Sequence, residues 1–131
     1  MIEPISTILG LLVFYQIKHF SADYLLQGKY MLGKFKEVGW VTPLAAHCSV
    51  HALMTMFVAI IMGLNIWVVL GLTLFDFISH FFIDKIKVEL SRGHTPQEPV
   101  FWYHLGLDQM AHHLVHYAII FTIVKILFKS S

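Results

Sequence analysis

The segment HFSAD (His19–Asp23) recurs as HFFID (His80–Asp84), and both copies lie inside strongly apolar sequence. Each copy places an aspartate four residues after a histidine. The chain around them is 57% hydrophobic and only 13% charged over 131 residues. A soluble domain of this size does not need so much apolar surface. We therefore predict an integral membrane protein with a single domain over residues 1–131.

Charge and cysteine content argue against nucleic-acid binding and against a disulfide-stabilised fold. The formal net charge is +1, so no basic surface for nucleic acid is expected. Cys48 is the single cysteine, which excludes an internal disulfide. The expected partners are membrane lipid and, in a homo-oligomer, further copies of the same chain.

Four apolar segments are long enough to span a bilayer, which takes about 20 residues per helix. Backbone polar groups in lipid must bond within their own segment, so each is expected to be a helix. The expected fold class is all-α, a polytopic membrane four-helix bundle made of two similar helical hairpins. The expected helices cover residues 5–27, 41–62, 64–91 and 96–128.

Three local signals predict helix boundaries. Thr42-Pro43 is typical of an N-cap followed by proline in the first turn. The run from Thr95 to Glu98 is typical of a capping box with proline at its first helical position. Gly93 is expected to end the third helix.

The basic residues predict the orientation in the membrane. Six lie in or beside the segments 28–40 and 85–99, and two lie near the C-terminus. Lysine and arginine favour the cytoplasmic side. Both segments are therefore expected in the cytoplasm and both termini on the non-cytoplasmic side, in a bacterial inner membrane.

The aspartates are placed where charge is costly. All four lie within or at the edge of apolar spans, whereas all four glutamates lie in loops or flanks. A charged residue at the centre of a membrane helix costs about 2.5–3.5 kcal/mol on insertion scales. Residues four apart share one helix face. Every expected helix therefore presents, on one face, a pair of histidine or aspartate side chains four residues apart. The pairs are His19/Asp23, His47/His51, His80/Asp84 and Asp108/His112.

The pairs repeat at two fixed spacings. Equivalent members of one hairpin are 28 residues apart, as in Asp23 and His51, and the second hairpin follows the first with an offset of 61. Similar distances from the intervening loop place the pairs at similar depth. HFSAD and HFFID are thus predicted to be equivalent positions in a duplicated hairpin.

These side chains suit a divalent metal, one or two ions of zinc, manganese or iron. Two ions would resemble dinuclear sites in soluble four-helix bundles, and one ion would leave some pairs as supporting carboxylate–histidine bonds. Packing histidines that bond across helices are the alternative without metal. The expected ligands are His19, Asp23, His47, His51, His80, Asp84, Asp108 and His112, with Asp84 and Asp108 also catalytic. Supporting or substrate-contacting roles are expected for Asp76, His116, Gln27, Gln109 and Lys85.

Four stretches carry a resemblance to a known family: HFSADYLLQ, HCSVH, HFFIDKIK and DQMAHH. They resemble the pattern of domain-of-unknown-function family 3307, a small family of bacterial and phage membrane proteins. That family is distantly similar to inner-membrane metal-dependent hydrolases, so the resemblance implies such an activity. The matching positions are His19, Asp23, Gln27, His80, Asp84, Asp108, Gln109 and His112.

Four functions are consistent with these observations. A metal-dependent hydrolase would use metal-activated water near the cytoplasmic leaflet, on a lipid or isoprenoid phosphate. Its cytoplasmic cations would face an anionic head group: Lys29, Lys85, Lys87 and Arg92. A divalent metal-ion transporter would use similar pairs but needs polar residues along the whole span. Bis-histidine haem ligation leaves the aspartates unexplained, and the last alternative is a non-catalytic membrane protein with a structural metal.

Overall fold

Four long helices make up the described part of this computed structural model, residues 3–129: α1 (Pro4–Phe20), α2 (Val41–Ile61), α3 (Ile66–Ser91) and α4 (Pro99–Leu127). No strand occurs among these described residues, which confirms the all-α class. Residues 1, 2, 130 and 131 of the expected single domain lie outside the described residues.

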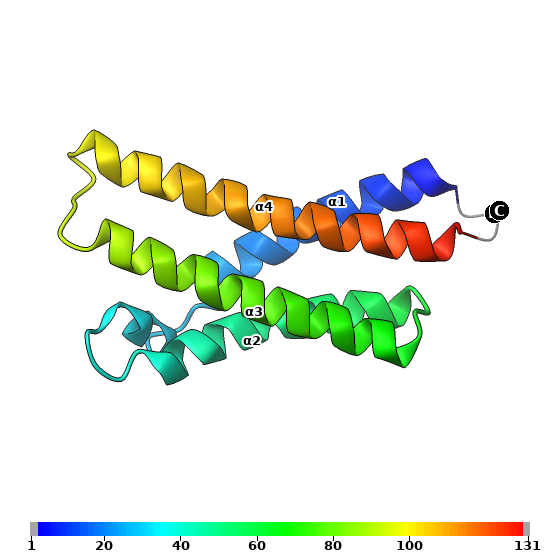
Figure 1. Cartoon of the computed structure of the whole chain (residues 1–131), viewed down its shortest axis with the longest axis horizontal. Coiled ribbons are helices and arrows are strands. Elements are labelled where there is room, and N and C mark those ends of the chain that lie inside the picture. The colour runs from blue at the N-terminus through cyan, green and yellow to red at the C-terminus, as the bar shows by residue number, and fades with distance from the viewer. Residues whose placement is uncertain (1–2, 130–131) are drawn as a thin grey trace.

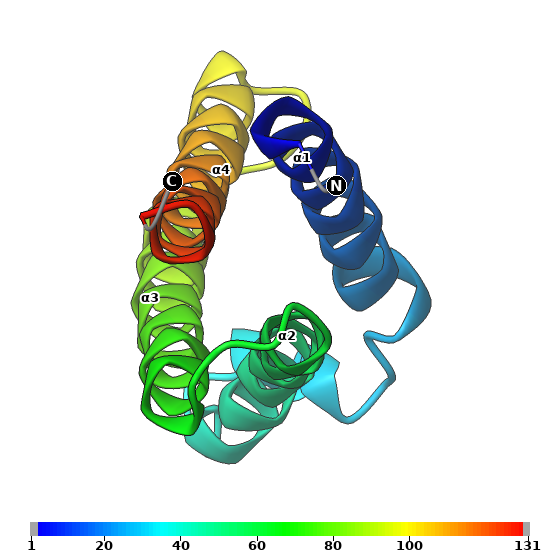
Figure 2. The ribbon, with the colours of Figure 1, turned by 90° about the vertical axis from the view of Figure 1, so that its right-hand side faces the viewer.

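The helices run up and down between two ends of an elongated bundle (Figure 1). The start of α1, the end of α4 and the turn between α2 and α3 lie at one end, here called the terminal end. The segments 28–40 and 92–98 lie at the other, here called the loop end. Figure 2 looks along the bundle and shows the four helices arranged around a shared interior.

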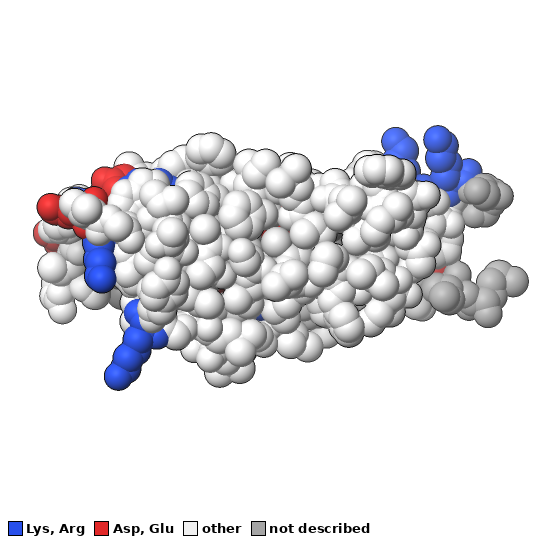
Figure 3. Space-filling model, turned by 90° about the horizontal axis from the view of Figure 1, so that it is seen from below, with Lys and Arg blue, Asp and Glu red and all other residues white. Residues whose placement is uncertain are grey.

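The outer surface of the bundle is apolar along its middle. All four helices are long and apolar enough to cross a membrane, and each exposes large hydrophobic side chains, such as Leu9, Phe57, Leu74 and Phe121. On the face seen in Figure 3, charged side chains gather at the two ends and leave an uncharged band between them. These features indicate an integral membrane protein.

Two of the predicted N-caps are wrong, Thr42 and Thr95, although α2 does begin at residue 41 as expected. α2 begins at Val41 with Trp40 as its N-cap, and no side chain caps it, so Thr42 lies inside the first turn. α4 begins at Pro99, because Thr95 to Glu98 closes its own turn through a bond from the Glu98 N–H to the Thr95 carbonyl (2.9 Å). Only half of the capping box forms, with the Glu98 carboxylate accepting from the Thr95 N–H (3.1 Å).

The same Glu98 carboxylate also bonds the His94 ring (2.9 Å). That bond, followed by the one from Thr95, lowers the pKa of the Glu98 carboxyl below its ordinary value. The short connection at the loop end is thus held by local polar bonds between α3 and α4.

The ends of α1 and α3 differ in kind. The α-helical part of α1 stops at Phe20 and continues as a π-helical turn, η1 (Ser21–Leu25), with the Leu26 N–H bonded to the Ser21 carbonyl (2.8 Å). The first span is therefore not the uniform helix expected over 5–27. α3 stops as predicted before Gly93, whose positive φ of 80° is a conformation that favours glycine.

The interior divides into two halves along the bundle. Toward the terminal end lies an apolar core that includes Leu11, Val58, Leu72, Ile119 and Ile123. Toward the loop end, the buried side chains are mostly histidine, aspartate and lysine. The apolar half closes the bundle at one end, so any polar chemistry must be reached from the other.

Candidate metal centre

The eight predicted ligand side chains lie together in the loop-end half of the interior. Seven belong to buried residues, and the Asp23 side chain keeps 20% of its surface exposed. Each helix contributes its i,i+4 pair to this cluster, as the contacts below describe. Their role as metal ligands stays a prediction, because the convergence also fits a network of bonded polar groups.

Asp23 is contacted by three imidazoles. Its carboxylate lies 3.0 Å from His51 Nε2, 3.2 Å from His19 Nε2 and 3.3 Å from His47 Nε2. No lysine pairs with it among the described residues. Asp23 sits in the π-helical turn η1, and such turns are frequent at functional sites. Its charge therefore needs a protonated imidazole or a bound cation.

Asp84 is the equivalent carboxylate of the second hairpin. It lies 3.1 Å from His112 Nε2 and 3.3 Å from His47 Nε2. It also accepts a bond from the Lys34 ammonium (2.8 Å). His47 thus stands between Asp23 and Asp84, but neither approach is an aligned hydrogen bond. One imidazole joins the carboxylates of the two hairpins.

Asp108 completes the cluster on α4. Its Oδ1 lies 3.3 Å from His112 Nε2, and its Oδ2 accepts from the Gln109 amide (2.9 Å). The Gln109 carbonyl oxygen in turn lies 2.9 Å from His19 Nε2. Lys87 approaches Asp108 only to 3.9 Å. Gln109 therefore lies beside the cluster and links α4 to α1.

Equivalent residues of the two hairpins make equivalent contacts. His51 approaches Asp23, and His112 approaches Asp84, across the same separation of 28 residues and at nearly equal distances, 3.0 and 3.1 Å. This equivalence agrees with the predicted duplication of the hairpin. It places one carboxylate–imidazole group on each side of His47.

A second polar layer lies one turn deeper, around Asp76. Asp76 bonds the Lys18 ammonium (2.6 Å), the His80 Nδ1 (2.8 Å) and the Thr55 hydroxyl. Thr55 also bonds the Tyr15 hydroxyl (3.1 Å). Lys18 and Asp76 have no exposed side-chain surface. Asp76 therefore contacts the Nδ1 side of the His80 ring, and its supporting role stays a prediction.

Sequence reasoning missed Lys18 and misplaced Lys34. Lys18 interrupts the first apolar span and is completely buried, and an isolated lysine within a span was the signal that marked it. Lys34 was expected only as a charge of the cytoplasmic loop, yet it is 6% exposed and bonded to Asp84.

Lys85 lies outside the cluster, and its predicted role in contacting a substrate stays a prediction. Lys85 bonds Glu89 and lies over the Trp40 ring at 3.7 Å. It follows Asp84 directly, and consecutive side chains point about 100° apart around a helix. Asp84 faces the interior, so Lys85 cannot. Of the other supporting residues, Gln27 bonds the Asp23 carbonyl (3.1 Å) and His116 lies beside the Tyr15 ring, with ring centres 5.0 Å apart.

Lys34 reaches Asp84 because the chain folds back at the loop end. It belongs to a short 3₁₀ helix, η2 (Met31–Phe35), that packs on α2. Its neighbour Gly33 approaches Pro43 so closely that an added Cβ would lie 2.8 Å from the proline Cγ. The absence of a side chain at Gly33 therefore permits the contact that brings Lys34 inward.

A Gly33→Ala variant is expected to push η2 away from α2 and weaken the Lys34–Asp84 pair. Overpacking of this kind typically costs about 1–3 kcal/mol in the free energy of unfolding. Denaturant unfolding of purified protein in detergent measures it. Gly28→Ala is the control, because nothing lies within 4 Å of its added Cβ. Equal stability of the two variants would contradict the prediction.

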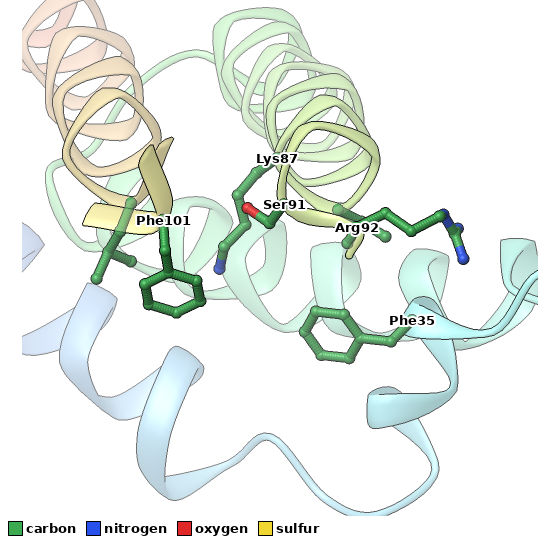
Figure 4. A pocket seen from close by; sticks show the side chains of 7 residues that line it. Phe35, Lys87, Ser91, Arg92 and Phe101 are labelled. Atoms are coloured by element: carbon green, nitrogen blue, oxygen red, sulfur yellow. The ribbon is translucent and has the colours of Figure 1, made fainter. Parts of the chain in front are cut away.

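The cluster opens toward the loop end through a small polar pocket of about 100 Å³. Its lining includes Asp23, Gln27, Lys34, Asp84 and Asp108. A larger pocket of about 370 Å³ lies next to it and shares Phe35, Lys87 and Leu105 with it. In this larger pocket Lys87 extends its ammonium between Phe35 and Phe101 (Figure 4).

The donor atoms and the charge of the cluster fit a divalent cation. The cluster and the Asp76 layer contain four buried or half-buried aspartates but only three lysines, Lys18, Lys34 and Lys87. The last of these is partly exposed and lies 3.9 Å from Asp108. Several buried imidazole nitrogens and Asp108 Oδ1 have no hydrogen-bond partner among the described residues. Buried polar atoms are rarely left in that state without an ion or water.

Three sets of side chains could each hold an ion, because the donor atoms within each set lie within 4.8 Å of one another. They are His19/Asp23/His51, Asp84/Asp108/His112 and His19/His80/His116. The first two correspond to the two hairpins and contain carboxylates. The third contains only imidazoles and draws in His116, which sequence reasoning had placed in a supporting role.

The sequence comparison assigns a family. The model of the family described as protein of unknown function (DUF3307) matches residues 11–131. The chain belongs to this family. No curated protein and no solved structure matches it.

The DUF3307 match includes every residue of the cluster and of the Asp76 layer, from Tyr15 to His116. Membership therefore agrees with the resemblance carried by HFSADYLLQ and DQMAHH. It adds no activity, since the family is defined without one, and the chemistry must be argued from the site itself.

Proposed function

We propose that this DUF3307 protein is a metal-dependent hydrolase that acts on a phosphorylated lipid at the membrane surface of its loop end. The observation that carries the proposal is the cluster of carboxylates and imidazoles in contact with a polar pocket at that end. The excess of basic residues there favours the cytoplasmic leaflet.

The chemistry needs a metal and a water. A bound divalent ion brings the pKa of a coordinated water toward neutrality and polarises a phosphoryl oxygen. Carboxylate and imidazole ligands suit zinc, manganese or iron. The two groups that would hold one or two ions are His19/Asp23/His51 and Asp84/Asp108/His112, with His47 between them.

The two predicted catalytic carboxylates differ in their surroundings. Asp84 accepts a bond from the Lys34 ammonium and lies beside His47 and His112, the position expected of a ligand. Asp108 Oδ1 has no hydrogen-bond partner among the described residues, and Asp108 lines the polar pocket. Asp108 is thus the better placed of the two to accept a proton from an attacking water.

The neighbouring pocket supports an amphiphilic substrate. Its walls are largely apolar, with Phe35, Phe101 and Leu105 among them, and Lys87 stands where it meets the polar pocket. An acyl or isoprenoid chain would lie along the apolar walls, with its phosphate beside Lys87. Arg92 contributes less, because it pairs with Glu89 (3.2 Å).

Transport of a divalent ion is the second candidate, because the same ligands would bind it. The apolar core at the terminal end disfavours this function. Leu11, Val58, Leu72 and Ile123 fill the interior beyond the Asp76 layer, and an ion would meet no ligand there. A transport path would require another copy of the chain or a large rearrangement.

Paired assays separate the two functions. Purified protein in detergent, supplied with zinc or manganese, is expected to release phosphate from lipid phosphates, and the protein in sealed liposomes is expected to carry no metal flux. Flux without hydrolysis would favour transport. Tightly held metal with neither signal would leave a structural site.

Lys87→Gln is expected to raise the KM for a lipid phosphate about tenfold, because a charged hydrogen bond contributes about 1.5–3 kcal/mol and this side chain is partly exposed. The kcat should change less, since Lys87 binds the substrate rather than the metal. Lys36→Gln is the control, an exposed lysine of the same end that lines neither pocket. An unchanged KM for Lys87→Gln would remove Lys87 from the substrate site.

A further inference from the structure

We infer that His19, His80 and His116 form a second, deeper metal site that binds a zinc-like divalent ion. One ring nitrogen from each lies within 4.8 Å of the others. The three histidines come from α1, α3 and α4, so an ion between them would tie three helices together. The inference does not depend on the proposed hydrolase activity. That activity would use the two carboxylate-containing ligand sets nearer the loop end, His19/Asp23/His51 and Asp84/Asp108/His112, here called the carboxylate groups.

Burial without hydrogen bonds is the independent observation. The three histidines are 5%, 0% and 1% exposed, in chain order. Both nitrogens of His116, the Nε2 of His80 and the Nδ1 of His19 have no hydrogen-bond partner among the described residues. A buried polar atom left unpaired is unfavourable. A bound cation would satisfy a lone pair from each ring at once.

The bond behind His80 prepares it as a ligand. Its Nδ1 lies 2.8 Å from the Asp76 carboxylate, which is itself held by Lys18 and Thr55. A carboxylate on one ring nitrogen fixes the tautomer, orients the ring and makes the other nitrogen a better donor. His80 Nε2 is then the free ligand atom.

The two ring nitrogens of His19 serve different sites. Its Nε2 faces Asp23 (3.2 Å) and Gln109 (2.9 Å), on the side of the carboxylate groups. Its Nδ1 is unpaired and is available to the deeper site. His116 enters from the other side, with its ring centre 5.6 Å from that of His19 and 6.0 Å from that of His80.

The ligand type predicts which metal the deeper site takes. Three imidazoles without a carboxylate favour zinc, copper or nickel, whereas carboxylates also accept manganese and magnesium. The rings are almost inaccessible to solvent, so a substrate has little access and the ion would be structural. We therefore expect zinc to raise the thermal stability of the protein and manganese to do so much less.

Zinc content tests the site. Wild type, His116→Gln and His94→Gln are dialysed against zinc in detergent, and bound zinc per chain is measured by mass spectrometry. We expect His116→Gln to hold one zinc fewer than wild type and to lose the zinc-dependent rise in Tm. His94→Gln, an exposed histidine outside the cluster, should match wild type. Equal zinc in wild type and His116→Gln overturns the inference, as does a wild type without zinc.

An Asp108→Asn variant separates this inference from the proposed function. If both sites exist, it loses one zinc and keeps the zinc that His116→Gln loses. If only the deeper site exists, Asp108→Asn binds as much zinc as wild type while His116→Gln binds none. If only the carboxylate groups bind metal, Asp108→Asn loses zinc and His116→Gln does not.

Diffraction decides the case in which His116→Gln does not fold. Crystals of the zinc-loaded wild type, measured at the zinc absorption edge, should give an anomalous peak between the rings of His19, His80 and His116. The absence of a peak there, with peaks at the carboxylate groups alone or nowhere, overturns the inference.

Discussion

Asp84→Asn is expected to abolish metal binding at the carboxylate groups of the second hairpin and to reduce hydrolysis to the rate of metal-free protein. The Asp84 carboxylate lies within 3.3 Å of Lys34, His47 and His112 at once. The substitution keeps the size of the side chain and removes its charge. Lys34 would then be a buried cation without a counter-ion, which would repel a metal from the same place.

Two measurements check this prediction together, metal content after dialysis and turnover of a lipid phosphate. Glu89→Gln is the matched control, an acidic residue of the same helix whose partners are Lys85 and Arg92 at the surface. It should keep both metal and turnover. Full turnover in Asp84→Asn would rule out Asp84 as a ligand needed for catalysis.

Lys18→Met is expected to destabilise the protein by about 3–5 kcal/mol, the usual cost of removing one partner of a buried ion pair. Lys18 and Asp76 are 2.6 Å apart, and neither side chain is exposed. Methionine fills similar space but leaves the Asp76 charge with only Thr55 and His80. Denaturant unfolding in detergent measures the loss, with Lys29→Met, an exposed site, expected to change stability by less than about 0.5 kcal/mol.

The double variant Lys18→Met/Asp76→Asn tests the cause. Removing both charges should recover much of the stability, because the penalty comes from an unpaired buried charge rather than from lost packing. The asparagine can still accept a hydrogen bond from His80. A double variant as unstable as Lys18→Met alone would show that the pair is not the source of the effect.

The helical class and the i,i+4 pairs were readable from the sequence because both depend on local periodicity. Hydropathy over about 20 residues predicts a span, and four-residue spacing places His19 beside Asp23, or Asp108 beside His112, whatever the tertiary fold. The matched separation of 28 residues reflects equal distances from the intervening loop, and this predicted the approach of His51 to Asp23.

Helix N-caps were less predictable, although they are also local. Thr42 and Thr95 both precede proline in patterns typical of caps, yet neither caps a helix. At Thr95–Glu98 the Glu98 carboxylate makes the capping-box bond to the Thr95 N–H, but the Glu98 N–H bonds the Thr95 carbonyl and closes a separate turn before the helix. A sequence typical of a helix cap shows which hydrogen bonds are possible, but not which of them form in the fold.

Long-range pairing was decided only by the tertiary structure. Lys18 and Asp76 are 58 residues apart, and Lys34 and Asp84 are 50 apart. Neither separation follows the spacings of the repeat. Lys34 enters the interior because η2 packs on α2 beside Gly33. The Lys18 side chain extends from α1 into the interior and bonds Asp76 of α3.

The sequence by itself thus determined which residues share a helix face and at what depth they lie, because the helix period and the length of a span are constant. Only the tertiary structure decided which lysine meets which aspartate, and that a ring nitrogen of His116 lies within 4.8 Å of one from His19 and one from His80. The physical reason is that these contacts depend on how the helices rotate and cross, which the packing of the whole bundle sets.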